Sequence, residues 1–412
     1  MNETRVIRLC WVVYNGVHYH MARLRALAHS AQWEITLLQL LDNDVFAALE
    51  CSGDEYSRIR LVTAAPGLKR GSLSDPALAK ALERKLSELM PDIVCVNGWG
   101  LPGSATTLKW CHNHHRLAIM MSESTLMDVA RSPLQEYIKR VLLRFCHAML
   151  CGGTPHREYA LALGMPGECI FLGYDSIDNN TFDKASHAIR MQAEHIRQSL
   201  SVPQRYFLAV SRFSEKKNLC GLLYAYAAYR SSSTSSQSGE LWHLILLGDG
   251  ELRPALEAQI VALNLETSVH LHGFATYEKL PGYYALASAF VHASTTEQWG
   301  LVVNEAMACG LPVLVSERCG CARDLIDEGI NGYRFNPYST DAIAAVMQRI
   351  ATLPERERES MGEASRKIIA DWGPERFARG LQDAVSCATA TKRSRATWVD
   401  RLILGLVASI RP

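Results

Sequence analysis

Short apolar runs recur along the first half of the chain, separated by stretches with helical spacing. Seven such runs are strand candidates, at residues 6–14, 34–40, 59–63, 92–97, 117–122, 148–152 and 169–174. Amphipathic stretches at 19–31 and 75–90 have the spacing of helices. Near-continuous apolar strands that alternate with helices predict a parallel sheet covered on both faces.

The same alternation restarts after a polar stretch at about residues 175–205. Six further strand candidates follow, at 206–211, 243–248, 269–273, 289–294, 312–316 and 332–335. The sequence therefore predicts two doubly wound, Rossmann-like α/β domains. We place the N-terminal domain at 1–185, a linker at 186–204, the C-terminal domain at 205–390 and a final helical segment at 391–412. Ligands of such folds bind beyond the carboxyl ends of the strands, so we expect a site in a cleft between the two domains.

The composition is that of a globular protein without a strong overall charge. The chain has 412 residues, 48% hydrophobic, with 43 basic and 42 acidic side chains. This balance provides no global field that would attract nucleic acid. None of the 12 cysteines lies in a C-x2-C pair, and no apolar run is long enough to span a bilayer. We therefore expect a cytoplasmic protein with reduced thiols.

Two basic residues follow the first strand of the second half. Arg212 and Lys217 lie in "SRFSEKKNL", between a strand and a helix that starts near Asn218. A guanidinium fork and a mobile ammonium group suit phosphate oxygens, and a helix N-terminus adds unpaired N–H groups. Taken alone, the same turn could be a solvated basic loop.

A glycine-rich turn follows the next strand. Gly248 and Gly250 flank Asp249 in "LLGDGEL". Two interpretations remain open here. The glycines either supply positive φ in a tight turn or let a nucleotide approach the backbone.

Two carboxylates lie eight positions apart in "EQWGLVVNEAMACG". Glu297 falls in the loop after strand 289–294, and Glu305 falls in a helix that starts near Gly300 and ends near Gly310. Carboxylates accept hydrogen bonds from vicinal hydroxyl groups, such as those of ribose and hexose rings. The order of carboxylate, helix start and carboxylate therefore suits a sugar, a diphosphate and a ribose.

Taken together, these segments resemble a known enzyme family. "SRFSEKKN", "LLGDG", "VHLHGF" and "EQWGLVVNEAMACGLPVLVS" occur in this order. They are similar to the donor half of retaining glycosyltransferases of the GT-B fold, and in particular to glycosyltransferase family 4 with its E-x7-E signature. The similarity is strong over 205–350 and weaker over 1–185. It implies two Rossmann-like domains that face each other across a cleft, and a final helix at 396–412 that returns to the N-terminal domain.

The resemblance also implies roles for individual residues. Arg212 and Lys217 would neutralise the donor diphosphate, Glu297 would bind hydroxyls of the donor sugar, and Glu305 would bind the ribose. Other residues would contact the donor mainly through the backbone: Gly16, Gly248, Gly273, Phe274, Gly300 and Leu301. The resemblance implies no cofactor and no metal, because side chains and amides take over the charge stabilisation.

The N-terminal half departs from the family pattern near the donor sugar. Family members often have a histidine after a middle strand, whereas this chain has Ser122 and Glu123 in "MMSEST". We expect Glu123 to contact sugar or acceptor; a helix-capping Ser-Glu-Ser cluster is the alternative. His18 and His20, in the first loop, and Ser122 are candidates to line the acceptor site.

The implied activity is transfer of a sugar from a UDP- or GDP-sugar to a hydroxyl acceptor, with retention of configuration. Polysaccharide, glycolipid or natural-product assembly in a bacterium is the expected setting. Two alternatives share the architecture: a nucleotide-sugar 2-epimerase and a non-catalytic nucleotide-sugar-binding protein. The sequence leaves the acceptor, the donor sugar and base, the linkage and the oligomeric state open.

Two amphipathic segments raise the question of membrane contact. "EYIKRVLLRF" at 136–145 is a basic amphipathic helix, and "TWVDRLILGLVASI" at 397–410 is a second amphipathic stretch. Both patterns are compatible with a peripheral membrane contact at the inner face. For the first we expect an ordinary solvated helix face, and for the second a helix that packs back on the body of the protein.

Overall fold

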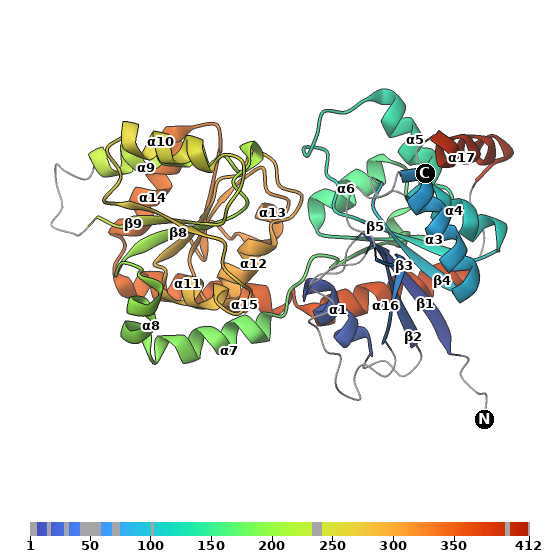
Figure 1. The fold of residues 1–412 in the computed structure, drawn as a ribbon, viewed down its shortest axis with the longest axis horizontal. Coiled ribbons are helices and arrows are strands. Elements are labelled where there is room, and N and C mark those ends of the chain that lie inside the picture. Colours follow the sequence, from blue (N-terminus) through green and yellow to red (C-terminus); the bar gives the residue numbers. More distant parts are fainter. Residues whose placement is uncertain are drawn as a thin grey trace. The chain divides into compact units, whose positions relative to one another are not determined.

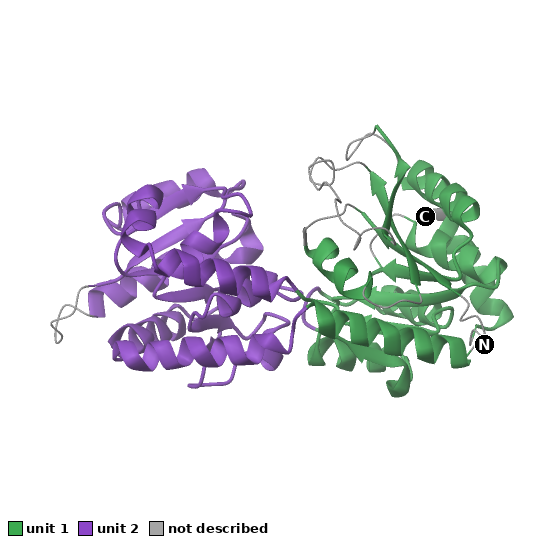
Figure 2. Ribbon diagram, turned by 90° about the horizontal axis from the view of Figure 1, so that it is seen from below, with its two compact units in different colours: residues 1–126, 130–176, 374–412 green, residues 127–129, 177–373 purple. Residues whose placement is uncertain are grey.

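The computed structural model describes residues 6–14, 18–28, 33–41, 59–67, 75–99, 103–232, 241–391 and 396–410. The chain divides into two compact units (Figure 2). Unit 1 comprises Met1–Leu126, Ala130–Ser176 and Pro374–Pro412, and unit 2 comprises Met127–Val129 and Ile177–Gly373. No helix among the described residues is both long and apolar enough to cross a membrane.

Unit 1 is built on a seven-stranded sheet in the order β3-β2-β1-β4-β5-β6-β7, and every paired strand is parallel. All seven strands predicted in the first half are present. They are β1 (Ile7–Val13), β2 (Trp33–Leu41), β3 (Ile59–Ala65), β4 (Ile93–Asn97), β5 (Leu117–Ser122), β6 (Ala148–Cys151) and β7 (Ile170–Leu172).

Helices cover both faces of this sheet, as the apolar strands predict. In β1, Cys10 and Val12 join one core, and Leu9 and Trp11 join the other, because successive side chains point to opposite faces. The first core includes residues of α3 (Asp75–Leu89), α4 (Ser104–Asn113), α5 (Pro133–Leu143), α6 (Thr154–Ala162) and α17 (Trp398–Ile410). The second includes residues of α1 (His18–Ala28) and α16 (Pro374–Thr391). The short helix η2 (Gly167–Cys169) precedes β7.

Unit 2 has a six-stranded sheet in the order β10-β9-β8-β11-β12-β13, again with parallel pairs. The six strands predicted for the second half are present. They are β8 (Tyr206–Val210), β9 (His243–Leu247), β10 (Val269–Gly273), β11 (Ala289–His292), β12 (Val313–Ser316) and β13 (Gly332–Phe335).

Helices also lie on both sides of the second sheet (Figure 1). Residues of α9 (Leu219–Ser232), α10 (Arg253–Ala262) and α14 (Thr340–Thr352) share one core with the strands. The remaining helices are α7 (Asn179–Arg190), α8 (Ala193–Leu200), η3 (Glu215–Lys217), α11 (Leu280–Leu286), α12 (Leu301–Ala308), α13 (Ala322–Leu325) and α15 (Glu355–Ala370).

The units divide the chain at other places than the sequence suggested. The range expected to be a linker, 186–204, contains the end of α7 and all of α8, and both helices pack against α11 within unit 2. The C-terminal part of the expected second domain, from Pro374 onward, belongs to unit 1. The reason is α16, whose apolar side chains Phe377, Leu381 and Val385 are buried in a core of unit 1. α17 packs against α4 and α5 of the same unit.

Candidate functional site

The candidate site lies where the strand order of unit 2 changes direction. β8 and β11 are neighbours, but the chain leaves β8 toward β9 on one side and leaves β11 toward β12 on the other. The loops that follow these two strands therefore diverge, and doubly wound sheets bind ligands at this point. Two hydrogen bonds join the loops: Thr295 N donates to Lys216 O at 2.9 Å, and the side-chain Asn218 Nδ2 donates to Ala293 O at 3.2 Å.

Glu297 and Lys217, one from each loop, form an ion pair. His292, at the end of β11, places Nε2 3.2 Å from the same carboxylate oxygen, Oε2. Ser294 Oγ lies 3.5 Å from this oxygen and 3.1 Å from the imidazole nitrogen. Three side chains therefore converge on one oxygen of Glu297.

The protonation states of this cluster follow from burial and charge. Burial lowers the pKa of His292, so its imidazole is neutral at neutral pH. Because the carboxylate oxygen can only accept, the neutral ring donates to it from Nε2. Burial opposes ionisation of Glu297, but the hydrogen bond from His292 and the charge of Lys217 hold the pKa of this carboxyl well below its usual range. Glu297 is therefore a fixed anion held by a cation and a neutral donor.

Arg212 presents a second positive charge on the loop after β8. Its side chain is exposed, and no carboxylate among the described residues pairs with it. The ion pair with Glu297 offsets the charge of Lys217, whereas Arg212 is a cation that is available to an incoming anion.

Gly248 and Gly250 shape the loop that carries Arg212. A Cβ on Gly248 would lie 1.9 Å from Ser211 O, and one on Gly250 would lie 2.6 Å from Phe213 O. The φ angle of Gly248 is 138°, which L side chains rarely adopt. The two glycines therefore let the loops after β8 and β9 approach each other, with Phe213 N donating to Asp249 O at 2.8 Å.

The next strand end carries the pair expected near the base. Gly273, with a φ of 70°, accepts a hydrogen bond from Gly248 N at 2.7 Å. Phe274 follows it, and 83% of its surface is exposed. Phe274 therefore exposes an apolar ring one residue after the backbone contact with the glycine-rich turn.

The helix expected at 300–310 is present as α12 and begins after Gly300, whose φ is 106°. A neighbouring loop fixes the approach to this helix: Gly320 N donates to Glu297 O at 3.0 Å, and Cys321 N donates to Trp299 O at 3.2 Å. Leu301 is the first helical residue, so the helix starts four positions after Glu297.

Glu305 lies in the second turn of α12 in a different environment from Glu297. It is 1% exposed, and its carboxylate accepts the hydroxyl of Tyr284 at 2.7 Å. A ribose hydroxyl would reach Glu305 only after side chains around it move. Of the two expected carboxylates, the structure pairs Glu297 directly with Lys217.

The candidate residues of unit 1 lie at another strand edge. Gly16 is outside the described residues, as is the side chain of His18. The expectation that His18 and His20 belong to the first loop is wrong, because both are in the first turn of α1. The ring of His20 packs edge-on against Trp11, with ring centroids 4.9 Å apart.

Ser122 is the last residue of β5 in unit 1, and Glu123 follows it. Ser122 is buried and its Oγ accepts a hydrogen bond from Ser124 N at 3.2 Å. No helix starts within the next eight residues, all of them described, so this cluster caps no helix. Glu123 is half-buried, and its charge, together with burial, raises the pKa of Tyr174. Tyr174 donates to Asn97 Oδ1 at 2.6 Å.

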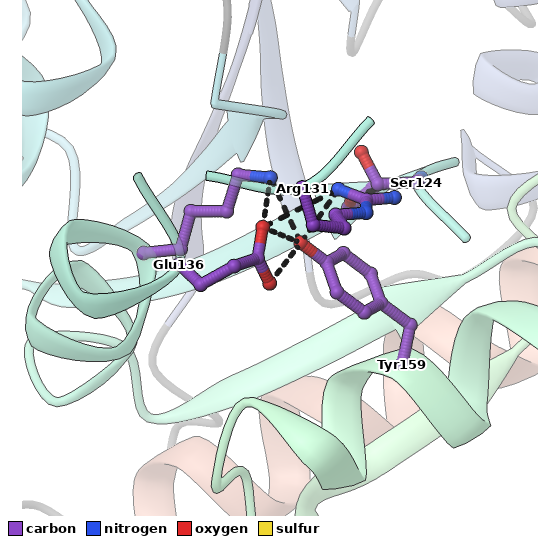
Figure 3. A network of polar contacts seen from close by, with 6 residues as sticks. Ser124, Arg131, Glu136 and Tyr159 are labelled. Carbon is purple, nitrogen blue, oxygen red and sulfur yellow. Dashed lines mark hydrogen bonds and ion pairs between the residues drawn. The ribbon is translucent and has the colours of Figure 1, made fainter. Parts of the chain in front are cut away.

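A polar network near this edge was not predicted from the sequence (Figure 3). Tyr159 of α6 donates to Glu136 of α5 at 2.8 Å. Lys139 donates to the same carboxylate at 3.0 Å and Arg131 at 3.4 Å. Burial opposes ionisation of Glu136, but these donors lower its pKa. The network joins the start of α5 to α6.

His292, Ser294 and Tyr284 are the functional-site residues that sequence reasoning missed. His292 could have been found from the sequence, because it is the one titratable residue in the apolar strand "AFVHAS". Tyr284 had no such signal, since its partner Glu305 lies 21 positions away and their contact depends on how α11 and α12 pack.

The fold of this chain is similar to the folds of several solved structures. Over 92% of its length, the fold matches the Anabaena protein HepE in complex with UDP and glucose, with a TM-score of 0.71 and 18% identity over 99% of that chain. It also matches sucrose-phosphate synthase from Thermosynechococcus elongatus, with a TM-score of 0.72 and 19% identity, over 93% of this chain and 99% of that one. The fold is therefore that of GT-B glycosyltransferases, with two Rossmann-like parallel-sheet domains.

Sequence comparison agrees with the fold. Residues 191–368 match the family described as glycosyl transferases group 1. The alpha-monoglucosyldiacylglycerol synthase of Acholeplasma laidlawii is 29% identical over 73% of this chain and 78% of its own length. The alpha-D-kanosaminyltransferase of Streptomyces kanamyceticus is 27% identical, over 62% of this chain and 64% of its own length. An amylovoran biosynthesis glycosyltransferase of Erwinia amylovora is 30% identical, over 46% of this chain and 44% of its own length. The chain thus spans less than two thirds of the last two relatives. The chain is therefore similar, in its fold and in the sequence of its second half, to glycosyltransferases of the GT-B fold.

Proposed function

We propose that the protein transfers a sugar from a nucleoside-diphosphate sugar, a UDP- or GDP-sugar, to a hydroxyl group of an acceptor, with retention of anomeric configuration. The observation that carries this proposal is the cluster at the switch point of unit 2. It combines an exposed cation, Arg212, with a cation and an anion, Lys217 and Glu297, that are held together.

The ion pair suits a donor that carries both a diphosphate and a sugar. A diphosphate that binds Arg212 competes with Glu297 for Lys217, because both are anions that need the same ammonium group. When Lys217 turns toward the phosphates, Glu297 is released to accept hydrogen bonds from sugar hydroxyls. His292 stays behind Glu297 and keeps the carboxylate in place.

The charges also suit the chemical step. The bond between the anomeric carbon and the diphosphate oxygen breaks, and a bond between that carbon and the acceptor oxygen forms on the same face. The acceptor proton passes to the leaving diphosphate oxygen. Arg212 and Lys217 would stabilise the negative charge that develops on this oxygen. Stabilisation of developing charge by fixed groups is usually the largest single effect that lowers an activation barrier in enzymes. We propose that these side chains make a metal ion unnecessary, so turnover should persist in a chelator.

Thermal unfolding in the presence of nucleotides tests the proposal. A ligand that binds only the folded state raises the unfolding midpoint by mass action. One nucleotide class among UDP-, GDP-, ADP- and TDP-sugars should raise the midpoint, and Arg212→Ala and Lys217→Ala should abolish the shift. Lys216→Ala is the matched control, since Lys216 is an exposed neighbour with the same charge.

The outcomes separate the proposal from its alternatives. No shift with any nucleotide sugar, in folded protein free of bound nucleotide, would contradict it. Conversion of the donor to its 2-epimer without an acceptor would identify an epimerase instead. Binding without turnover across an acceptor panel would favour a binding protein. With a productive acceptor, the anomeric proton coupling of the product determines whether configuration is retained.

A further inference from the structure

Two cysteines of unit 1 bring their sulfur atoms into contact. Cys387 Sγ, in α16, lies 3.2 Å from Cys169 Sγ, at the end of η2. Both thiols are free in the structure. Because a disulfide bond is about 2.05 Å long, the two sulfurs would form one after an approach of about 1 Å. Their contact means that the two side chains already point toward each other.

The pair lies at an edge of the seven-stranded sheet. Cys169 immediately precedes β7, and β7 is the last strand in the sheet order. Cys387 packs against the cores on both faces of this sheet. The pairing of β7 with β6 starts at Ile170, so a small shift of Cys169 toward Cys387 breaks no strand pairing. A disulfide therefore fits this position without a change in the sheet.

The two thiols differ in their access to solvent. Cys169 is 8% exposed, whereas Cys387 is half-buried. Among the cysteines that the structure describes, Cys220 and Cys387 are the two that are not buried. In thiol–disulfide exchange the attacking sulfur must reach its reagent. Cys387 is therefore the thiol that meets a reagent from solvent, and Cys169 is its partner in the protein.

The thiols inside the cores of unit 1 provide a contrast. Cys10 and Cys95 are fully buried on β1 and β4. Burial raises the pKa of Cys10 to about 12 and holds the pKa of Cys95 well above its usual range. Because the thiolate is the reactive form, such thiols are inert and only fill space. Cys387 combines partial exposure with a second sulfur in contact, which a thiol that only fills space does not need.

We propose that Cys169 and Cys387 form a dithiol site that low-molecular-weight disulfides, such as oxidised glutathione, convert to an intrachain disulfide. The Cys387 thiolate attacks one sulfur of the reagent, so that a mixed disulfide forms and one glutathione leaves as its thiol. The Cys169 thiolate then attacks Cys387 Sγ and releases the second glutathione. The two protein thiols are oxidised, the reagent is reduced to two thiols, and their protons pass to the released glutathione.

The bond would join the two segments from which unit 1 is assembled (Figure 2). Cys169 belongs to Ala130–Ser176 and Cys387 to Pro374–Pro412. The two cysteines are 218 positions apart, and the segment Ile177–Gly373 lies between them. A cross-link that closes a long loop restricts the unfolded chain strongly. The disulfide would thus hold α16 covalently on the sheet that it covers. This inference concerns unit 1 and does not depend on the proposed glycosyl transfer.

Oxidation of the full-length protein tests this inference. The reduced protein is incubated with oxidised glutathione, denatured, and treated with a reagent that counts free thiols. The count should fall from 12 to 10, because one disulfide consumes two of the 12 cysteines. The intact mass should fall by two hydrogen atoms, with no glutathione retained. A proteolytic digest should contain the peptides of Cys169 and Cys387 joined, and the denatured protein should migrate faster on a non-reducing gel because its chain contains a closed loop.

Three variants assign the roles of the two thiols. Cys169→Ser should accumulate one glutathione on Cys387, because the thiol that resolves the mixed disulfide is missing. Cys387→Ser should form neither the cross-link nor the mixed disulfide, and its gel mobility should not change. Cys220→Ser is the matched control, since Cys220 is the other cysteine in the described residues that is not buried. It should form the cross-link as the wild type does.

The cross-link should also raise the unfolding midpoint of the wild type by about 5–10 °C, and Cys387→Ser should show no such rise. Wild-type protein that keeps all its thiols, or that retains glutathione on Cys387, would overturn the inference. So would a cross-link that maps to other cysteines, or a midpoint that falls on oxidation. The gel, the peptide map and the midpoint of the wild type decide the matter even where a variant does not fold.

Discussion

At the scale of single residues, His292 determines how the candidate site holds its anion. It is a buried, neutral imidazole that donates to Glu297 Oε2 from Nε2. It is a positioning residue, because it acts on a ligand only through Glu297. The ion pair alone would leave the carboxylate free to rotate with the flexible lysine.

Variants of His292 should therefore distinguish its effect on the orientation of Glu297 from its effect on the stability of the fold. His292→Ala removes a donor to a charged group and leaves a cavity, and should lower the free energy of unfolding by about 2–4 kcal/mol. His292→Gln keeps an N–H donor and should lose less. Nucleotide-sugar stabilisation should be weakened in the alanine variant and largely retained in the glutamine variant. Equal ligand responses in the two variants would contradict a positioning role.

The same residue contributes to the pH dependence of stability. The pKa of His292 is lower in the folded protein than its ordinary value of 6.5. Between these two values the unfolded chain binds more protons, so the free energy of unfolding falls as the pH is lowered below about 6.5. The contribution is fully present above that pH. Urea titrations at a series of pH values should show a smaller slope in His292→Gln, by up to about 1.4 kcal/mol per pH unit.

At the scale of elements, the glycine-rich turn and the Arg212 loop form one unit. Gly248→Ala should be severe, because its Cβ would meet Ser211 O and because the φ angle is unfavourable. Gly329 also has a positive φ, 78°, but open space around it, so Gly329→Ala serves as a control for backbone strain without a steric clash. The control should cost about 1 kcal/mol, and Gly248→Ala should cost at least twice as much and weaken nucleotide binding. Equal midpoints for the two variants would contradict this.

The elements themselves were predictable from local pattern. All 13 strands expected from apolar runs are present, because strands buried on both faces are continuously apolar and cannot be mistaken for surface helices. Arg212, Lys217 and Glu297 were predictable as strand-end residues for the same reason. The partners of Glu297 and Glu305 were not all predictable, since the Tyr284 contact arises from helix packing, which no short sequence window contains.

At the scale of the whole molecule, unit 1 is assembled from both ends of the chain. α16 contributes Phe377, Leu381 and Val385 to a core that otherwise comes from residues before 177. This could not be predicted from the sequence, because the amphipathic pattern of a helix does not indicate which of two sheets the helix covers. The predicted domain boundaries follow the pause in the alternation of strands and helices along the sequence. The boundaries in the structure follow the division of tertiary contacts between the two units.

Truncation tests this arrangement. A chain that ends at Gly373 loses α16 and α17 and exposes one face of the unit 1 sheet, so unit 1 should unfold or aggregate. Unit 2 keeps all its elements in such a chain. Limited proteolysis should leave a resistant fragment of about 177–373 that retains a nucleotide-dependent unfolding shift. A truncated protein with wild-type resistance in residues 1–176 would contradict the role of α16.

The same topology has a consequence for synthesis on the ribosome. Unit 2 is continuous from Ile177 and can fold as soon as Gly373 has left the exit tunnel. The first 176 residues, although made earlier, must wait for the last ones to cover their sheet. The half of the protein that is translated first is therefore the half that is completed last, and in the interval it offers an apolar sheet face to chaperones.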